Sequence, residues 1–202
     1  MIRALCVDLM GTLLYDPYIE ALEVVGRRFV DPSSWADFEK GSIDEAEFVR
    51  RFFRDGDQGR RDLAAFHRVR RAGYRFLPGM RALLDAVGGK LDRYVASNYP
   101  VWIEELREVF DLDSCCEGVW ASHHLGVRKP DPEFYYQLLT RIDHPAPRCL
   151  FVDDQENNCV AAEATGMRAH HFDGAAGLAE RLAAEGIDIG PSGAQRTSST
   201  DR

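Results

Sequence analysis

The chain opens with a short apolar run that ends on a single carboxylate. Residues 4–7 read Ala-Leu-Cys-Val, and Asp8 follows at once. Gly11 and Thr12 then give a turn signal. A nearly continuous apolar run that stops at a turn predicts a strand buried in a sheet. Ligands of open α/β sheets bind beyond the carboxyl ends of the strands, so we predict that Asp8 is the reacting group of a site at that edge.

Four later segments predict further strands, at residues 93–96, 118–122, 149–152 and 168–172. Helical patterns lie around and between them, at residues 78–87, 101–110, 131–139, 157–165 and 176–185. Strands that alternate with helices indicate a parallel sheet with right-handed crossovers. The expected fold class is therefore α/β.

Residues 15–76 form a block with almost no strand signal. The pairs Asp16-Pro17 and Asp31-Pro32 are both typical of a helix start, because Asp caps a helix and Pro suits its first position. Residues 42–45, Ser-Ile-Asp-Glu, read as a capping box before another helix. We therefore predict an all-helical insertion after the first strand.

Composition narrows the class of partner and the compartment. The net charge of −8 argues against a nucleic-acid backbone as partner. The five cysteines form no C-x-x-C pair, which disfavours zinc and a disulfide framework and suggests a reducing cytoplasm. We find neither a segment that could span a bilayer nor a signal peptide. We expect a cytoplasmic monomer or homodimer, with a disordered tail at residues 190–202.

Polar side chains follow four strands of the predicted sheet, and they are Asp8, Ser97, Asn98, Lys129, Asp153 and Asp154. Asp8 beside Asp154 alone would be repulsive, whereas Mg²⁺ binds one or two carboxylates together with a substrate phosphate and water. With Mg²⁺ and Lys129 shielding a phosphate, the Asp8 carboxylate can attack phosphorus and form an aspartyl-phosphate. Ser97 and the backbone N–H groups after Asp8 would hold the phosphate oxygens.

In position and order these residues resemble the four motifs of the haloacid dehalogenase-like hydrolase superfamily. The D-x-D-G-T motif is read at residues 8–12, and the strand that ends in Ser or Thr ends at Ser97. The lysine in a K-P-D-P setting is Lys129, and the strand that ends in two aspartates ends at residues 153–154, with Asn158 downstream. The resemblance extends to about residue 171.

This resemblance implies a Rossmann-like core of residues 1–14 and 77–189, with residues 15–76 as a helical cap. It implies Mg²⁺ as cofactor and a small phosphorylated metabolite as substrate. The implied catalytic residues are Asp8, Ser97 and Lys129, and the implied substrate-binding residues are Gly11, Thr12 and Asn98. The implied metal ligands are Asp8, Asp153, Asp154 and the backbone carbonyl of Met10, with Asp153 the more indirect of the three carboxylates.

Shorter stretches resemble the FMN hydrolases of plant chloroplasts and suggest FMN or another small phosphomonoester as substrate. They include residues 8–12, 38–41, 52–56, 98–102 and 129–135. Aromatic residues of the predicted cap could stack on a flavin ring, but core packing of a small helical cap explains them equally well. These residues are Trp35, Phe38, Phe48, Phe52 and Phe53.

Met10 departs from the family pattern, which has a second aspartate at this position. That aspartate protonates the leaving group and then activates water, and a thioether can do neither. A positioned general acid contributes roughly 10²–10⁴ in rate, so we expect slow turnover unless Tyr15, Asp16 or water supplies the proton. Two alternatives stay open: a metal-independent 2-haloacid dehalogenase, and a catalytically weak phospho-ligand binder.

Overall fold

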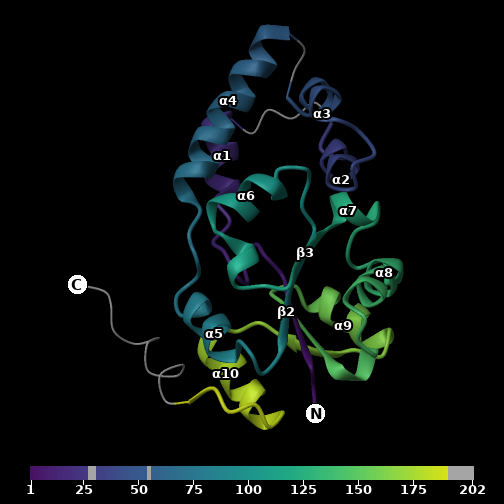
Figure 1. Cartoon of the computed structure of the whole chain (residues 1–202). Coiled ribbons are helices and arrows are strands. Elements are labelled where there is room, and N and C mark those ends of the chain that lie inside the picture. The colour runs from purple at the N-terminus through teal and green to yellow at the C-terminus, as the bar shows by residue number, and fades with distance from the viewer. Residues whose placement is uncertain (27–30, 54–55, 191–202) are drawn as a thin grey trace, which may run out of the picture.

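A five-stranded parallel sheet forms the centre of the protein (Figure 1). The computed structural model describes residues 1–26, 31–53 and 56–190, so all of the predicted tail except Gly190 lies outside the described residues. The strand order is β3-β2-β1-β4-β5, which places the strand that precedes Asp8 in the middle of the sheet. The strands are β1 (Ala4–Val7), β2 (Asp92–Ser97), β3 (Gly118–Ala121), β4 (Cys149–Asp153) and β5 (Arg168–His171).

The alternation of side chains along each strand builds two hydrophobic cores, one on each face of the sheet. In β1, Leu5 and Val7 join the core on one face, while Ala4 and Cys6 join the core on the other. The first face is covered by α5 (Met80–Val87), α6 (Ile103–Val109) and α10 (Ala175–Ala184). The second is covered by α8 (Pro132–Ile142) and α9 (Glu156–Ala164). The predicted α/β fold is confirmed.

Short elements complete the connections of the sheet. They are the helix α7 (Ser122–Leu125) and the 3₁₀ turns η1 (Leu112–Ser114) and η2 (Ala146–Arg148). The sequence pattern did not predict α7, which directly continues β3. Four residues are too short for a periodic apolar signal, and the helix ends at Gly126 in the left-handed conformation.

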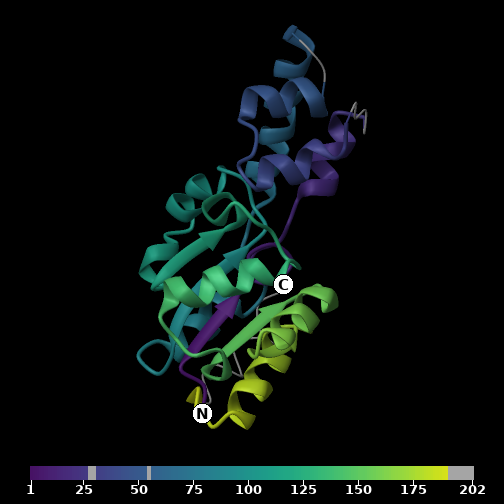
Figure 2. The same cartoon turned by 90° about the vertical axis from the view of Figure 1, so that its right-hand side faces the viewer.

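Four helices lie together beyond the carboxyl ends of the strands (Figure 2). They are α1 (Tyr18–Val24), α2 (Ser34–Glu39), α3 (Glu45–Phe52) and α4 (Gly56–Gly73). The Asp16 carboxylate accepts the Tyr18 amide at 3.0 Å and so helps to begin α1. The capping box predicted at residues 42–45 begins two residues too early, because Asp44 caps α3 by accepting the Glu47 amide at 2.8 Å. The division into a core and a cap at residues 15–76 stays a prediction.

The two chain segments that join this helical block to the sheet run side by side. The Tyr15 amide donates to the Arg75 carbonyl, and the Leu77 amide donates to the Leu13 carbonyl, each at 2.9 Å. An antiparallel bridge between Leu14 and Phe76 lies between these two bonds. The chain therefore leaves and re-enters the core at one place.

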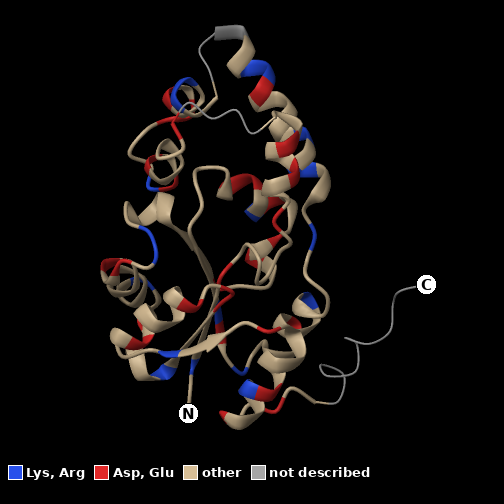
Figure 3. Cartoon of the chain, turned by 180° about the vertical axis from the view of Figure 1, so that it is seen from behind, with Lys and Arg blue, Asp and Glu red and all other residues tan. Residues whose placement is uncertain are grey.

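Charged residues of both signs are interspersed along the outer helices (Figure 3). Among residues 1–26, 31–53 and 56–190, no helix has the length and hydropathy required to cross a bilayer. All five cysteines are buried free thiols, as predicted for a chain without a disulfide framework.

Candidate active site

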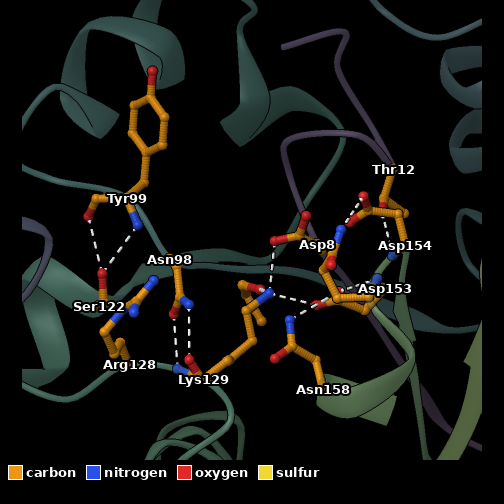
Figure 4. A network of polar contacts seen from close by, with 12 residues as sticks. Asp8, Thr12, Asn98, Tyr99, Ser122, Arg128, Lys129, Asp153, Asp154 and Asn158 are labelled. Carbon is orange, nitrogen blue, oxygen red and sulfur yellow. Dashed lines mark hydrogen bonds and ion pairs between the residues drawn. The ribbon is translucent and has the colours of Figure 1, made fainter. Parts of the chain in front are cut away.

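Lys129 joins the ends of β1 and β4 by a buried ion-pair network (Figure 4). Its Nζ lies 2.6 Å from Asp8 Oδ1 and 2.6 Å from Asp153 Oδ2, and it also donates to the Ala96 carbonyl at 2.9 Å. All three charged side chains are buried. Three strands thus supply acceptors for one ammonium group, which agrees with the predicted meeting of strand ends.

Burial and the neighbouring charges shift the pKa values of Asp8 and Lys129. The pKa of Asp8 is raised to about 7, chiefly by burial, with Asp153 and Asp154 adding to the rise and Lys129 opposing it. Burial alone would lower the pKa of Lys129, but Asp8 and Asp153 outweigh it and raise that pKa above its ordinary value. The amine therefore stays cationic, and any further positive charge beside Asp8 would favour its ionised form.

Asn98 positions Lys129 through the backbone. Its Oδ1 accepts the Lys129 amide at 2.8 Å, and its Nδ2 donates to the Lys129 carbonyl at 2.9 Å. The two bonds use both ends of the carboxamide on the backbone N–H and C=O of one residue, as Figure 4 shows. We predicted Asn98 as a substrate-binding residue, and the structure gives its side chain this positioning contact.

Asp154 is held close to the loop that follows β1. Its backbone amide donates to Thr12 Oγ1 at 3.1 Å, and its Oδ2 accepts Gln155 Nε2 at 2.8 Å. Gly11 has a φ of +80°, and a Cβ at that position would lie 2.7 Å from Asp154 Oδ2. Gly11 and Thr12, predicted to bind substrate, therefore both serve the placement of Asp154: one by lacking a side chain and the other by its buried hydroxyl.

The predicted metal ligands include a close trio of carboxylates. Asp8, Asp153 and Asp154 each offer an oxygen atom, and these atoms lie within 4.8 Å of one another. Oxygen donors of this kind suit Mg²⁺. Of the three, Asp153 has the fewest oxygen lone pairs left for a metal ion. Its Oδ1 accepts hydrogen bonds from Gln155 N and Asn158 Nδ2 at 2.9 Å each, and its Oδ2 accepts one from Lys129 Nζ. Asp8 and Asp154 fit a divalent cation better.

These groups line a cavity of about 230 Å³ at the carboxyl edge of the sheet, here called the strand-end cavity. Its walls include every predicted catalytic and metal-binding residue, namely Asp8, Met10, Ser97, Lys129, Asp153 and Asp154. Ser97 ends β2 and is buried at the cavity wall. Asn158 also lines the cavity, where it orients Asp153.

A second cavity, of about 180 Å³, lies between the strand ends and the helical block and is here called the helix-side cavity. Its walls include Tyr18, Trp35, Glu39, Arg70 and Tyr99. Of the five aromatic residues predicted to stack on a flavin or to form a core, only Trp35 is among these lining residues. The other four, Phe38, Phe48, Phe52 and Phe53, are buried in the hydrophobic core.

Arg70 is the site residue that sequence reasoning missed. It is only 1% exposed, and its guanidinium donates to the Tyr99 hydroxyl at 3.0 Å and lies 4.1 Å from the Trp102 ring centroid. A signal was present, because Arg70 falls seven residues after Leu63 on the apolar stripe of α4. An arginine on such a stripe requires buried partners.

Comparison with known proteins agrees with this geometry. The family model for haloacid dehalogenase-like hydrolase matches residues 2–166. Chloroplast flavin mononucleotide hydrolase 1 of Arabidopsis thaliana is 32% identical over 90% of this chain and 77% of its own length. A sesquiterpene phosphatase of Aspergillus oryzae is 30% identical over 84% of this chain and 89% of its own length.

Solved structures share the fold. A predicted HAD-like family hydrolase of Porphyromonas gingivalis superposes with a TM-score of 0.72 at 22% identity, over 91% of this chain and 98% of that one. A HAD family enzyme of Bacteroides thetaiotaomicron, in complex with magnesium and inorganic phosphate, gives a TM-score of 0.65 at 22% identity, over 84% of this chain and 93% of that one. The chain belongs to the haloacid dehalogenase-like hydrolase family and is a hydrolase.

Proposed function

We propose that this hydrolase is a Mg²⁺-dependent phosphomonoesterase that works through an aspartyl-phosphate on Asp8. The observation that carries the proposal is the strand-end cavity, where one buried lysine and three carboxylates meet. A phosphate in that cavity would face a nucleophile, a cation and a carboxylate pair at once. The two phosphate-related names among its relatives favour this chemistry over halide removal.

The roles follow from the contacts. Lys129 holds Asp8 Oδ1 at 2.6 Å, which leaves Oδ2 to attack phosphorus. Asp153 and Asn98 fix Lys129, so its positive charge stays where the transferring phosphoryl group gathers negative charge. Ser97 lines the cavity and would hold a phosphate oxygen. Bound at Asp8, Asp154 and the Met10 carbonyl, Mg²⁺ would neutralise phosphate charge and favour ionised Asp8.

For the substrate we propose a small phosphorylated metabolite, with FMN as the first candidate. The plant relative named for FMN hydrolysis supports this choice. So does the helix-side cavity, whose Tyr18, Trp35 and Tyr99 offer aromatic walls beside a cationic Arg70. We also propose a cytoplasmic location and a monomer or homodimer.

Replacing Asp8 with Asn tests the nucleophile. We expect the variant to lose at least about 10³-fold in kcat on FMN, sugar phosphates and a chromogenic phosphate ester. The wild-type protein should release phosphate with Mg²⁺ and stop when the cation is chelated. Brief reaction of the wild type followed by acid quench should give a phosphorylated peptide containing Asp8.

The same assay separates the alternatives. Release of halide from 2-haloacids that survives chelation would identify the dehalogenase instead. Calorimetric binding of FMN without any turnover would identify a phospho-ligand binder. Undiminished Mg²⁺-dependent phosphate release by Asp8→Asn would reject Asp8 as the nucleophile.

A further inference from the structure

The strand-end cavity and the helix-side cavity meet at a shared wall. Three residues line both cavities: Met10, Asp16 and Asn98. If the phosphate occupies the first cavity and the leaving group the second, the ester oxygen that joins them lies at this wall. The residue that protonates this oxygen must therefore come from these three side chains or from water.

Only one of the three side chains can deliver a proton. Met10 has a thioether, which carries no exchangeable proton. Asn98 uses its amide on the Lys129 backbone, and a carboxamide is not an acid at neutral pH. Asp16 has a carboxyl group, and it enters from the segment that joins β1 to α1. Tyr15, the other residue considered from sequence, lines neither cavity and bonds Glu20 instead.

The surroundings of Asp16 suit a group that cycles its proton. Its Oδ1 accepts the Tyr18 amide at 3.0 Å, which fixes the side chain and leaves Oδ2 for a substrate atom. Asp16 is an exposed residue that lines both cavities, so a ligand can reach it. Although the residue is exposed as a whole, desolvation of its carboxyl group raises its pKa to about 6, against the Tyr18 amide and Arg70, with Glu20 and Asp154 adding to the rise. General acids work best with a pKa near the working pH.

We propose that Asp16 replaces the aspartate missing at Met10 as the general acid and base of this hydrolase. The proposal rests on the phosphatase function proposed above. Protonated Asp16 gives its proton to the ester oxygen as the P–O bond breaks and the Asp8–phosphorus bond forms, which releases an alcohol. The Asp16 carboxylate then takes a proton from the water that attacks the aspartyl-phosphate. Phosphate leaves, and Asp8 carboxylate and protonated Asp16 are restored.

Asp16→Asn is the sharpest test, because Asn keeps an acceptor for the Tyr18 amide and loses only the acid. The readout is the first turnover, measured by rapid quench on two substrates. With an alkyl phosphate such as FMN, whose leaving group needs a proton, we expect the first turnover to slow by about 10²-fold or more. With p-nitrophenyl phosphate, whose leaving group departs as an anion, we expect a burst of nitrophenolate within about threefold of the wild-type rate, followed by slow steady turnover.

Glu23→Gln is the matched control, since Glu23 is an exposed acid on the neighbouring helix α1 that lines neither cavity, and it should leave both substrates unaffected. Asp16→Ser, which also keeps an acceptor, should reproduce the Asn pattern. Equal slowing of both first turnovers, or a wild-type first turnover on the alkyl ester, would overturn the role of Asp16. Failure of the phosphatase proposal looks different, because the wild-type protein itself would then give no burst.

Discussion

The strand-end cavity and the helix-side cavity are neighbours, but they are built in different ways. In the first, Lys129 bonds to Asp153 and Asn98 at 2.6–2.9 Å, and these two partners lie at the ends of β4 and β2. In the second, Trp35 and Arg70 come from separate helices that pack through aromatic side chains. The first wall is set by the register of a sheet, and the second by how four helices lie on one another.

This difference teaches which part of the site tolerates change. A substitution at the strand ends leaves a buried charge or donor without a partner, which lowers the free energy of unfolding strongly. A substitution in the helical block removes apolar contact, and its effect depends on how well neighbouring side chains close the gap. Four predictions test this contrast, from the largest expected effect to the smallest.

Lys129→Met should have the largest effect, because it leaves Asp8 and Asp153 buried without their shared cation. We expect kcat on a chromogenic phosphate to fall at least about 10³-fold. The free energy of unfolding by urea should fall by about 3–5 kcal/mol. Lys40→Met, which removes a partly exposed partner of Asp37, is the control and should change stability by less than about 0.5 kcal/mol. Equal stability of the two variants would contradict the contrast.

Phe48→Ala should destabilise the helical block and spare the chemistry. Phe48 is fully buried and stacks on Phe38 with ring centroids 4.4 Å apart. We expect the free energy of unfolding to fall by about 3–5 kcal/mol. Under conditions where the variant is folded, kcat on p-nitrophenyl phosphate should stay within a few-fold of wild type. Exposed Ile19→Ala serves as the control, and a parallel loss of kcat in Phe48→Ala would show that the two regions are not separable.

His67 should make the helical block sensitive to acid. Its pKa is lowered from the ordinary value of 6.5 to about 4, chiefly by burial and also by Arg70 and Arg71, against the opposing charges of Glu45 and Glu105. The unfolded chain thus binds the proton more readily, so this contribution to stability is complete above pH 6.5 and is lost as pH falls toward 4.

His67→Gln removes that sensitivity. Between pH 7 and pH 4 the wild type should lose about 1–3 kcal/mol more of its unfolding free energy than the variant does. Chemical denaturation at several pH values measures the difference. Parallel pH curves for the two proteins would contradict the prediction.

Asn98→Ala should give the smallest effect of the four, because it removes two hydrogen bonds and leaves the ion pairs of Lys129 in place. We expect a loss of about 1–2 kcal/mol in unfolding free energy and about tenfold in kcat, with little change in KM. Exposed Asn157→Ala is the matched control. A rise in KM with unchanged kcat would return Asn98 to the substrate-binding role first predicted for it.

The sequence predicted the fold and the gathering of the acidic residues for a physical reason. Asp8 and Asp153 stand at or just after a strand end, and Lys129 lies in the connection that follows β3 and α7. Parallel strands carry such residues to one edge. The sequence did not reveal what each polar side chain bonds. The side chains of Thr12 and Asn98 bond to Asp154 and Lys129, contacts that the sequence did not indicate, and their substrate-binding role stays a prediction. Hydrogen-bond partners distant in the chain leave no local pattern.

The walls of the helix-side cavity were still harder to predict. Arg70 and Glu39 lie on different helices, and helical periodicity does not say which faces of two helices meet across a cavity. The periodicity did locate the buried phenylalanines, because they need only be apolar and inward. Specific contacts of the helical block depend on tertiary packing, so only the structure could identify Arg70.

The paired segments at Leu13–Tyr15 and Arg75–Leu77 carry a consequence for how such enzymes diversify. The chain leaves and re-enters the core through this one pair of segments, so the helical block beyond them can be exchanged as a unit. The sheet keeps its register and the Asp8 carboxylate, while an exchanged helical block brings different cavity walls. Asp16 comes directly after the first of these segments. A helical block joined after Asp16 would keep this carboxyl group, and a block joined before Asp16 would lose it.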